Sequence, residues 1–270
     1  MPELPEVETT VNSLNILKNK KVIKVDVHTK KLRYPVPLNP IKQILNSKII
    51  NLRRIAKYVV IDFDNLNSII LHLGMSGRLK IYKDRTLIKK HDHLVFKFTN
   101  NNRLIFNDTR KFGFIDIVKS DKINNIRYIR KLGIDALDKK LSVDYLYKKF
   151  NKSEALIKQL LLNQHIVAGI GNIYASEILF DAKISPLKKG KEIKKYQIGT
   201  IIKSIKKILK KAIKYGGSSI NDYISPDGTL GNFQNRFKVY GKEGFKIRGS
   251  TIKKVVLYGR STYFCPNIQK

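Results

Sequence analysis

The sequence contains little cysteine, no tryptophan and no long apolar run. Its single cysteine, Cys265, excludes a framework of internal disulfides. No window approaches the roughly 18 consecutive apolar residues of a membrane-spanning helix. The amino terminus also lacks the basic-then-apolar layout of a signal peptide. These absences predict an intracellular protein without a membrane segment.

Acidic residues are scarce as well. Asp and Glu total 21 against 54 Lys and Arg, which gives the 270-residue chain a formal net charge of +33. Such an excess favours a polyanionic partner, because cations that neutralise phosphates release bound counterions. AT-rich codon usage is the alternative source of so many lysines, but it would not by itself deplete Asp and Glu. We therefore predict a nucleic-acid partner.

The amino terminus places a proline directly after the initiator methionine. Removal of Met1 would leave Pro2 with a free secondary amine. An α-amino group titrates about two to three pH units below a lysine, so part of it is an uncharged nucleophile at neutral pH. A secondary amine that condenses with a sugar aldehyde carbon gives a charged iminium, which is an electron sink for breaking neighbouring C–O bonds.

Apolar residues from Leu4 to Leu17 recur at helical spacing and predict an amphipathic helix. Glu3 and Glu6 would then share a face beside the Pro2 nitrogen. Prolines and acids also suit the first turn of any helix, where the macrodipole favours negative charge. The pattern alone leaves both interpretations open.

The rest of the amino-terminal half alternates between β-branched or aromatic runs and short turn signals. The predicted strand segments are 21–30, 49–64, 69–83, 94–98 and 103–106. Because runs such as HLVFKF alternate apolar and polar residues, residues 1 to about 119 are predicted to form a helix and a two-layer β-sandwich.

The carboxyl-terminal half is predicted to be helical from about residue 143. Isoleucines at helical spacing over 191–215, with lysines opposite, indicate a helix that Gly216-Gly217 ends. A membrane-surface anchor is the alternative for this helix, but the absence of Trp and of a wide aromatic face favours core packing. In the tail, FKVYG and KKVVLYG are predicted to pair as a β-hairpin over 237–263.

Two loops carry candidate wedge residues. In LHLGMSGRL, two glycines bracket Met75, so that a flexible apolar side chain can project outward. In FNDTRKFGF, Arg110 and Phe112 alternate on a short segment. An enzyme that reaches the sugar of a base in a duplex must rotate that base out, and apolar wedges fill the vacated stack.

Two further motifs have polar chemistry. GIGNIYASE puts Gly169 and Gly171 before a helix, where backbone amides can bind a phosphate, although this signal is weak alone. The KHDH run contains His91, Asp92 and His93, all of them metal-ligand types. Neighbouring ligands on one strand seldom complete a shell, and no second cluster completes this one, so no metal site is predicted.

The string MPELPEVETT closely resembles the start of the bacterial formamidopyrimidine-DNA glycosylase (Fpg/MutM) family, and the later motifs follow in the family's order. In that family the terminal proline is the nucleophile and the next glutamate is the acid. A lysine in the AKY context and an arginine of the carboxyl-terminal finger grip phosphates near the lesion. The resemblance therefore implies the catalytic residues Pro2, Glu3, Glu6, Lys57 and Arg260.

The resemblance also implies DNA contacts. The implied wedge residues are Met75, Arg110 and Phe112. They would occupy the space that the extruded base leaves in the stack, and the arginine would contact the base left without its partner. The other implied DNA-binding residues are His72, His91, Lys152, Lys158, Gly169, Gly171 and Asn172. Departures from the family at Asn163 and Ser153 imply a weakened or shifted contact there.

The family's loop that closes over the extruded purine resembles YGGSSINDYISPDG in this chain. Ser218, Ser219 and Tyr223 are the implied lesion-loop residues, with hydroxyl groups and a ring for stacking.

Relatives typically end in a zinc finger with two CxxC pairs, and this chain departs from that pattern. Cys265 stands at the third ligand position, Ile268 at the fourth, and FKIRG replaces the first pair. One thiolate cannot hold structural zinc, so we predict no cofactor and a finger held by packing of residues 255–257 and Tyr263. Arg260 is retained, and activity is therefore expected without zinc.

The predicted fold is α+β, with four parts. These are a catalytic helix and β-sandwich domain over 1–119, a hinge over 120–134, a helix-two-turns-helix DNA-binding domain with the lesion loop over 135–224, and a zincless β-hairpin finger over 225–270.

The resemblance implies a bifunctional DNA glycosylase and abasic-site lyase of base excision repair. It would excise oxidised purines, namely formamidopyrimidines and 8-oxoguanine, through a Schiff base on Pro2 followed by β- and δ-elimination. The implied partner is double-stranded DNA with damaged bases, bound by a cytoplasmic, nucleoid-associated bacterial monomer. Two alternatives stay open: an endonuclease VIII-like glycosylase for oxidised pyrimidines, and a catalytically silent DNA-binding relative.

Overall fold

The computed structural model describes residues 1–83, 87–219 and 225–270, which form two compact units. The amino-terminal unit comprises Met1–Arg130 and Tyr215–Gln234, and the carboxyl-terminal unit comprises Lys131–Lys214 and Asn235–Lys270. The predicted domains divided 215–234 between the helical domain and the finger, but by its contacts this segment belongs with the amino-terminal unit. The predicted loop residue Tyr223 lies outside the described residues.

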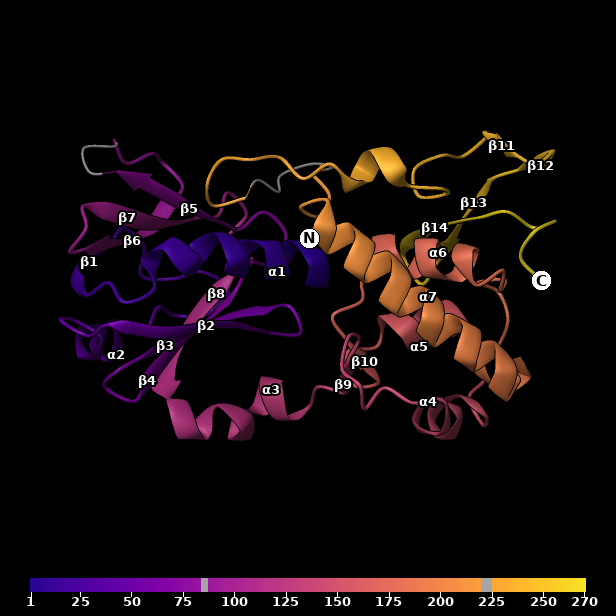
Figure 1. The fold of residues 1–270 in the computed structure, drawn as a ribbon, viewed down its shortest axis with the longest axis horizontal. Coiled ribbons are helices and arrows are strands. Elements are labelled where there is room, and N and C mark those ends of the chain that lie inside the picture. The colour runs from indigo at the N-terminus through magenta and orange to yellow at the C-terminus, as the bar shows by residue number, and fades with distance from the viewer. Residues whose placement is uncertain (84–86, 220–224) are drawn as a thin grey trace. The chain divides into compact units, whose positions relative to one another are not determined.

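Two four-stranded antiparallel sheets make up most of the amino-terminal unit (Figure 1). The first has the order β1-β6-β7-β5, with strands β1 (Val22–Val27), β5 (Arg78–Lys83), β6 (Asp92–Phe98) and β7 (Asn102–Asn107). The second has the order β2-β3-β4-β8, with strands β2 (Ile49–Ile55), β3 (Tyr58–Phe63), β4 (Asn67–His72) and β8 (Phe114–Lys119). Apolar side chains of both sheets share one core, which confirms the predicted sandwich.

The amino-terminal helix α1 (Leu4–Ser13) packs against β2 and β3 and continues into a 3₁₀ helix, Leu14–Leu17. Its buried positions include Leu4, Val7 and Val11, which belong to the predicted apolar stripe. The remaining helices of this unit are α2 (Leu38–Gln43), the 3₁₀ helix Ser120–Asn125 and α3 (Arg127–Arg130).

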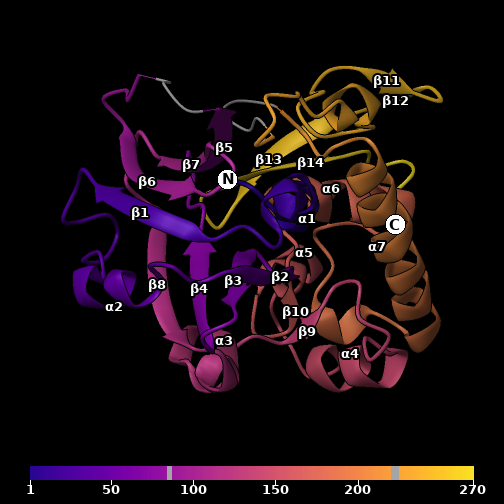
Figure 2. The same ribbon diagram turned by 60° about the vertical axis from the view of Figure 1, so that its left-hand side comes forward.

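The carboxyl-terminal unit is mainly helical and ends in two small hairpins (Figure 2). Its helices are α4 (Val143–Phe150), α5 (Ile157–Leu162), α6 (Asn172–Asp181) and α7 (Lys195–Lys214), with a 3₁₀ helix at Gly190–Glu192 and another at Phe233–Arg236, where the chain enters this unit. Its strands are β9 (Ile134–Asp135), β10 (Val167–Ala168), β11 (Lys246–Ile247), β12 (Ser250–Thr251), β13 (Lys253–Leu257) and β14 (Arg260–Phe264).

Helix α7 confirms the prediction of a core-packed amphipathic helix. Its isoleucines Ile198, Ile201 and Ile205 are fully buried where α7 packs on α4 and α6. No helix among the described residues is long and apolar enough to cross a membrane.

The sequence-based strand assignments were wrong at four places. Segment 69–83 contains β5 and most of β4, which belong to different sheets. Segment 49–64 is a hairpin of two strands, because the chain turns at Ala56 and Lys57 without a glycine, with Ala56 at φ +52°. Strand β8 was not predicted. In the finger, FKVYG does not pair with KKVVLYG; the hairpin partners are β13 and β14. The backbone of FKVYG instead donates its hydrogen bonds to a buried carboxylate, described below.

Candidate active site

The start of α1 is a buried, capped helix terminus. Pro2 is buried and Glu3 is 3% exposed. Glu3 is the N-cap residue, and its backbone N–H donates to Oε2 of Glu6 at 2.9 Å, as part of a capping box. The predicted nucleophile and acid therefore lie side by side at the positive end of a helix dipole, in a backbone geometry that Glu6 fixes.

Glu6 also holds the segment that follows α7. Its Oε1 accepts the N–H of Ser218 at 2.8 Å and the hydroxyl of Ser218 at 3.0 Å. Gly217 has φ +74°, and a Cβ there would lie 3.0 Å from the same oxygen, so both the backbone conformation and the close contact favour glycine. Ser219 accepts the N–H of Gly231 at 2.9 Å. The two predicted lesion-loop serines thus bond to protein groups at the base of their loop.

Lys57, in the turn before β3, lies near His72 at the end of β4. Lys57 is 6% exposed and directly precedes β3, as predicted for a residue at a strand head. The ring of His72 lies 5.1 Å from that of Tyr58 and stacks on Phe114. Nδ1 of His72 accepts the N–H of Gly74 at 3.1 Å, so in the neutral ring the proton resides on Nε2. Burial, together with the nearby Lys57 and Arg33, lowers the pKa of His72 to about 4.

The three predicted wedge residues are exposed on two touching loops. Met75 is 40% and Phe112 47% exposed, and the Arg110 guanidinium lies 4.7 Å from the centre of the Phe112 ring. At Gly74, φ is +63° and a Cβ would lie 2.4 Å from the backbone of Phe112 and Gly113. The loops therefore meet backbone to backbone, and only glycine fits at the crossing.

Asp108 fixes both wedge loops and was missed by the sequence analysis. Its fully buried carboxylate accepts the hydroxyl of Ser76 at 2.6 Å and the N–H groups of Arg110 and Gly113 at 3.2 and 2.8 Å. The signal that could have revealed it is an acid two residues before Arg110, in a loop where short polar side chains bond nearby amides.

The KHDH run serves the same loop. His93 is 3% exposed and its Nε2 contacts the backbone oxygen of Asp108 at 2.8 Å. Asp92 accepts from Asn107 at 2.7 Å and from the N–H of Lys89 at 2.9 Å. His91 is half-buried, and its backbone oxygen accepts the N–H of Asp108. Within residues 1–83, 87–219 and 225–270, no three His, Cys, Asp or Glu gather as a metal site.

In the carboxyl-terminal unit, Gln164 organises the GIGN loop. Its Oε1 accepts the N–H of Gly169 at 2.9 Å, and its Nε2 donates to the backbone oxygen of Ile170 at 2.8 Å. Gly169 has φ +103°, which favours glycine. Helix α6 then begins at Asn172 after Gly171, which has no side chain to cap it. Such a terminus is suited to an anion.

Two predicted phosphate ligands converge on the finger strand. Lys158 is 2% exposed, and its Nζ donates to the backbone oxygen of Ser261 at 3.1 Å and to the hydroxyl of Thr262 at 2.8 Å. Nδ2 of Asn172 donates to the same Ser261 oxygen at 3.0 Å. Arg260, the preceding residue, is exposed, as is Lys152.

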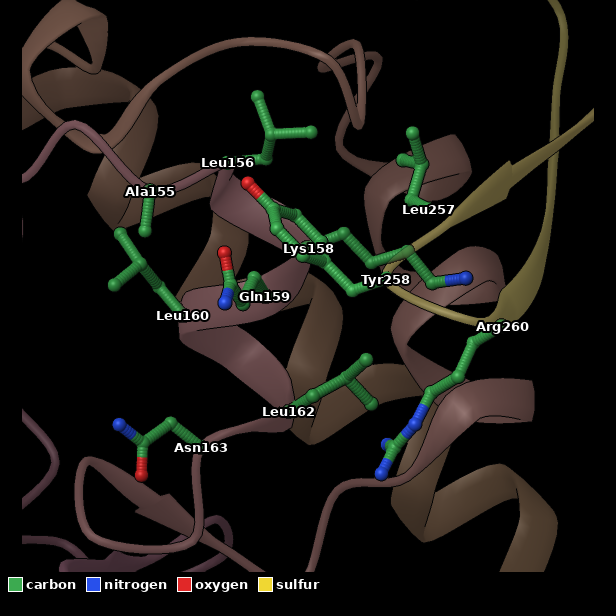
Figure 3. A pocket seen from close by; sticks show the side chains of 10 residues that line it. All are labelled: Ala155, Leu156, Lys158, Gln159, Leu160, Leu162, Asn163, Leu257, Tyr258 and Arg260. Carbon is green, nitrogen blue, oxygen red and sulfur yellow. The ribbon is translucent and has the colours of Figure 1, made fainter.

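A pocket of about 340 Å³ lies beside Arg260 (Figure 3). It is lined by the residues around α5 and by the β13–β14 turn, namely Ala155, Leu156, Lys158, Gln159, Leu160, Leu162, Asn163, Leu257, Tyr258 and Arg260. Figure 3 shows the Lys158 side chain extended from α5 toward the hairpin, while the Arg260 guanidinium is directed away from the hairpin backbone.

Glu177 on α6 is the buried carboxylate that redirects FKVYG. It is 2% exposed and accepts the N–H groups of Lys238, Val239 and Tyr240 at 2.9, 2.9 and 2.8 Å. Burial raises the pKa of its carboxyl, and the three donors offset part of that effect. Three backbone donors used in this way are not available for a β-ladder, which is why this segment is not a strand.

Replacing His72 with phenylalanine should flatten the pH dependence of the free energy of unfolding. Because the folded-state pKa of about 4 lies below the ordinary value of 6.5, the unfolded state takes up a proton first as the pH falls. Stability is therefore lost on acidification, by about 2 kcal/mol between pH 7 and 5 from this group alone. Urea unfolding at both pH values should show that loss shrink in His72→Phe. An unchanged pH dependence would contradict the buried neutral ring.

Asp108→Ala should lower the free energy of unfolding by about 3 kcal/mol, because it leaves buried donors of both wedge loops unsatisfied. Asp121→Ala is the matched control, since Asp121 is an exposed acid of the same unit, paired only loosely with Lys122 at 3.5 Å. Thermal melts of the two variants give the comparison. Equal melting temperatures would show that Asp108 does not hold the loops.

Comparison with known proteins places this geometry in a family. The family model described as the formamidopyrimidine-DNA glycosylase N-terminal domain matches residues 1–115, and the H2TH domain of the same family matches residues 132–223. The formamidopyrimidine-DNA glycosylase of Zymomonas mobilis is 45% identical, and that of Rickettsia bellii is 42% identical, each over 100% of both chains.

Solved structures of Lactococcus lactis Fpg are also similar. One is a complex of a mutant enzyme with DNA containing Fapy-dG, with a TM-score of 0.92, 34% identity and 100% of each chain covered. Another is the wild-type enzyme with DNA containing an oxidised pyrimidine, with a TM-score of 0.91 and the same identity and coverage. With two family models and full-length relatives in agreement, the chain belongs to the formamidopyrimidine-DNA glycosylase family.

Proposed function

We propose that this protein is a bifunctional DNA glycosylase and abasic-site lyase of base excision repair that removes oxidised purines from double-stranded DNA. The observation that supports it most is the start of α1, where Pro2 and Glu3 lie together at a capped helix terminus. The net charge of +33 suits a polyanionic duplex. Nucleoid association and action as a monomer are part of the same proposal.

The chemistry begins when Met1 has been removed. The Pro2 nitrogen forms a bond to C1′ of the damaged nucleotide and loses its proton as the glycosidic bond breaks, and Glu3 donates a proton to the departing base or to the ring oxygen O4′. The C1′–O4′ bond then breaks, and the departure of the protonated ring oxygen leaves an iminium between Pro2 and C1′. The iminium acidifies the C2′ hydrogen, and loss of that proton expels the 3′ phosphate. Loss of the C4′ proton then expels the 5′ phosphate, and water hydrolyses the iminium to free Pro2. A placed proton donor of this kind contributes about 10²- to 10⁴-fold.

The other site residues have two roles: some replace the extruded base in the stack, and others bind the DNA backbone. Met75, Arg110 and Phe112 would enter the vacated stack, because they are exposed on loops that Asp108 holds. Lys57 and Arg260 would contact phosphates near the lesion. His72 is neutral with its proton on Nε2, so it would donate a hydrogen bond to the DNA without adding a positive charge.

A second substrate class has one observation in its favour. A relative 34% identical to this chain has been crystallised with DNA containing an oxidised pyrimidine. Excision from duplexes that carry either an oxidised purine or an oxidised pyrimidine separates the two classes, and we expect the purine to be removed faster.

Borohydride trapping tests the nucleophile. With the mature protein and oxidised-purine duplex DNA, reduction should give a covalent adduct, and Pro2→Gly or retention of Met1 should sharply reduce it.

Glu3→Gln should slow base removal by about 10²- to 10⁴-fold yet still nick a preformed abasic site, because no base has to leave there. Glu8→Gln is the control on the same helix, since Glu8 pairs with Arg54 at 2.6 Å. If the wild-type protein gives neither a trapped adduct nor strand nicking, the proposal that it is a glycosylase and lyase is refuted.

We further propose that the finger works without zinc. Cys265 is fully buried; its Sγ lies 3.5 Å from the backbone oxygen of Ser250, and its N–H donates to Oε1 of Gln269 at 2.7 Å. Nε2 of Gln269 in turn donates to the backbone oxygen of Ile184 at 2.9 Å. One thiol among apolar and amide neighbours is not a zinc donor set.

Metal analysis of the purified protein should therefore find far less than one zinc per chain. A strong chelator should leave base excision unchanged, because the bonds of Gln269 do not depend on a metal. Stoichiometric zinc, or activity lost to the chelator and restored by zinc, would refute a metal-free finger.

A further inference from the structure

The buried ammonium of Lys158 is the starting point. Lys158 is 2% exposed, and its Nζ lies 3.1 Å from the Ser261 backbone oxygen and 2.8 Å from the Thr262 hydroxyl. Thr262 is itself fully buried. Burial of an ammonium is costly unless hydrogen bonds hold it, so these two contacts fix its place. In this position it is turned into the protein and away from a phosphate in solvent.

Both contacts connect Lys158 to the backbone at or next to Arg260. The Thr262 hydroxyl that accepts from Lys158 donates to the Arg260 backbone oxygen at 3.4 Å. The Ser261 oxygen, one peptide further on, accepts from Lys158 and from Asn172. Helices α5 and α6 are thereby both tied to the first residues of β14.

The start of β14 needs contacts of this kind to hold its backbone. Arg260 follows a two-residue turn, in which Tyr258 has φ +50° and Gly259 has φ +71°. A non-glycine residue at positive φ costs of order 1 kcal/mol and persists only where its surroundings hold it. The donor set around Cys265 does not suit a zinc ion that could brace the hairpin instead.

We propose that Lys158 is a positioning residue that sets the direction of Arg260, and that it does not itself bind a DNA phosphate. This inference rests on the proposed function, in which Arg260 grips the phosphates beside the lesion. Asn172 differs from Lys158: it is only half-buried, and its Oδ1 has no hydrogen-bond partner among the described residues. Nδ2 of Asn172 is the only donor of this side chain and could turn from Ser261 to a phosphate, whereas the buried ammonium of Lys158 stays with the finger.

Salt dependence separates the two roles of Lys158. A lysine that neutralises one phosphate contributes about 0.9 to the slope of log K against log salt concentration. A lysine that holds protein backbone contributes none. We expect Lys158→Met to keep the wild-type slope on abasic-site duplex DNA, while Arg260→Gln lowers it by about 0.9. Lys203→Met, which removes an exposed charge from α7, is the control for a lysine outside the machinery.

Kinetics test whether Lys158 acts through Arg260. Lys158→Met should slow single-turnover strand nicking by about 10- to 100-fold, the effect of a group displaced by an ångström. In the Arg260→Gln background it should add nothing, because the residue it positions is gone.

The buried Thr262 supplies a probe that cannot touch DNA. Thr262→Val keeps the shape but removes the hydroxyl, and it should reproduce the slow nicking of Lys158→Met without adding to it in the double variant. Thr262→Ser should restore the wild-type rate. Circular-dichroism melts show whether each variant is still folded at the assay temperature. If Lys158→Met is unfolded there, the nicking rates of Thr262→Val and Thr262→Ser are compared instead.

A slope reduced by about 0.9 in Lys158→Met would overturn the inference, as would an effect that persists fully in the Arg260→Gln background. These outcomes are distinct from failure of the enzyme itself. If the wild type gives no borohydride adduct, the proposed function fails, whereas an active wild type with an altered slope in Lys158→Met refutes only the positioning role.

Discussion

A buried carboxylate that accepts backbone N–H groups is the interaction on which three of the functional segments depend. Glu6 does this at the start of α1, Asp108 between the wedge loops, and Glu177 at the entry to the finger. Each is at most 3% exposed. Charge-assisted hydrogen bonds of this kind are roughly twice as strong as neutral ones and fix backbone direction. In a chain with only 21 acidic residues, three of them are used to hold loops rather than to offset lysines.

This arrangement explains which parts of the fold could be predicted from the sequence. Helices α1 and α7 and most sandwich strands follow from local periodicity, which depends on the residues themselves. The FKVYG segment has the alternation of a strand, but Glu177, some 60 positions earlier, takes its donors. The turn at Ala56 gives no glycine or asparagine signal either. Such outcomes depend on partners distant in sequence, which a local pattern does not contain.

The candidate site shows the same division. The exposure of Met75, Arg110 and Phe112 agrees with the prediction of outward-facing side chains, because glycines and polar neighbours are local signals. The residue that supports them, Asp108, was missed. Lys158 matches the family by sequence, yet its burial against the finger gives it different neighbours from those of a phosphate ligand. A residue match identifies a position, and its contacts decide what the side chain can do there.

The central claim is that the Pro2 amine at the capped start of α1 is the nucleophile. Peptide mapping by mass spectrometry of the borohydride-reduced protein–DNA adduct tests it most directly. The account predicts the reduced sugar on a peptide that begins at Pro2, with Met1 absent. An adduct on Lys57 or another lysine, or on a chain that retains Met1, would contradict it.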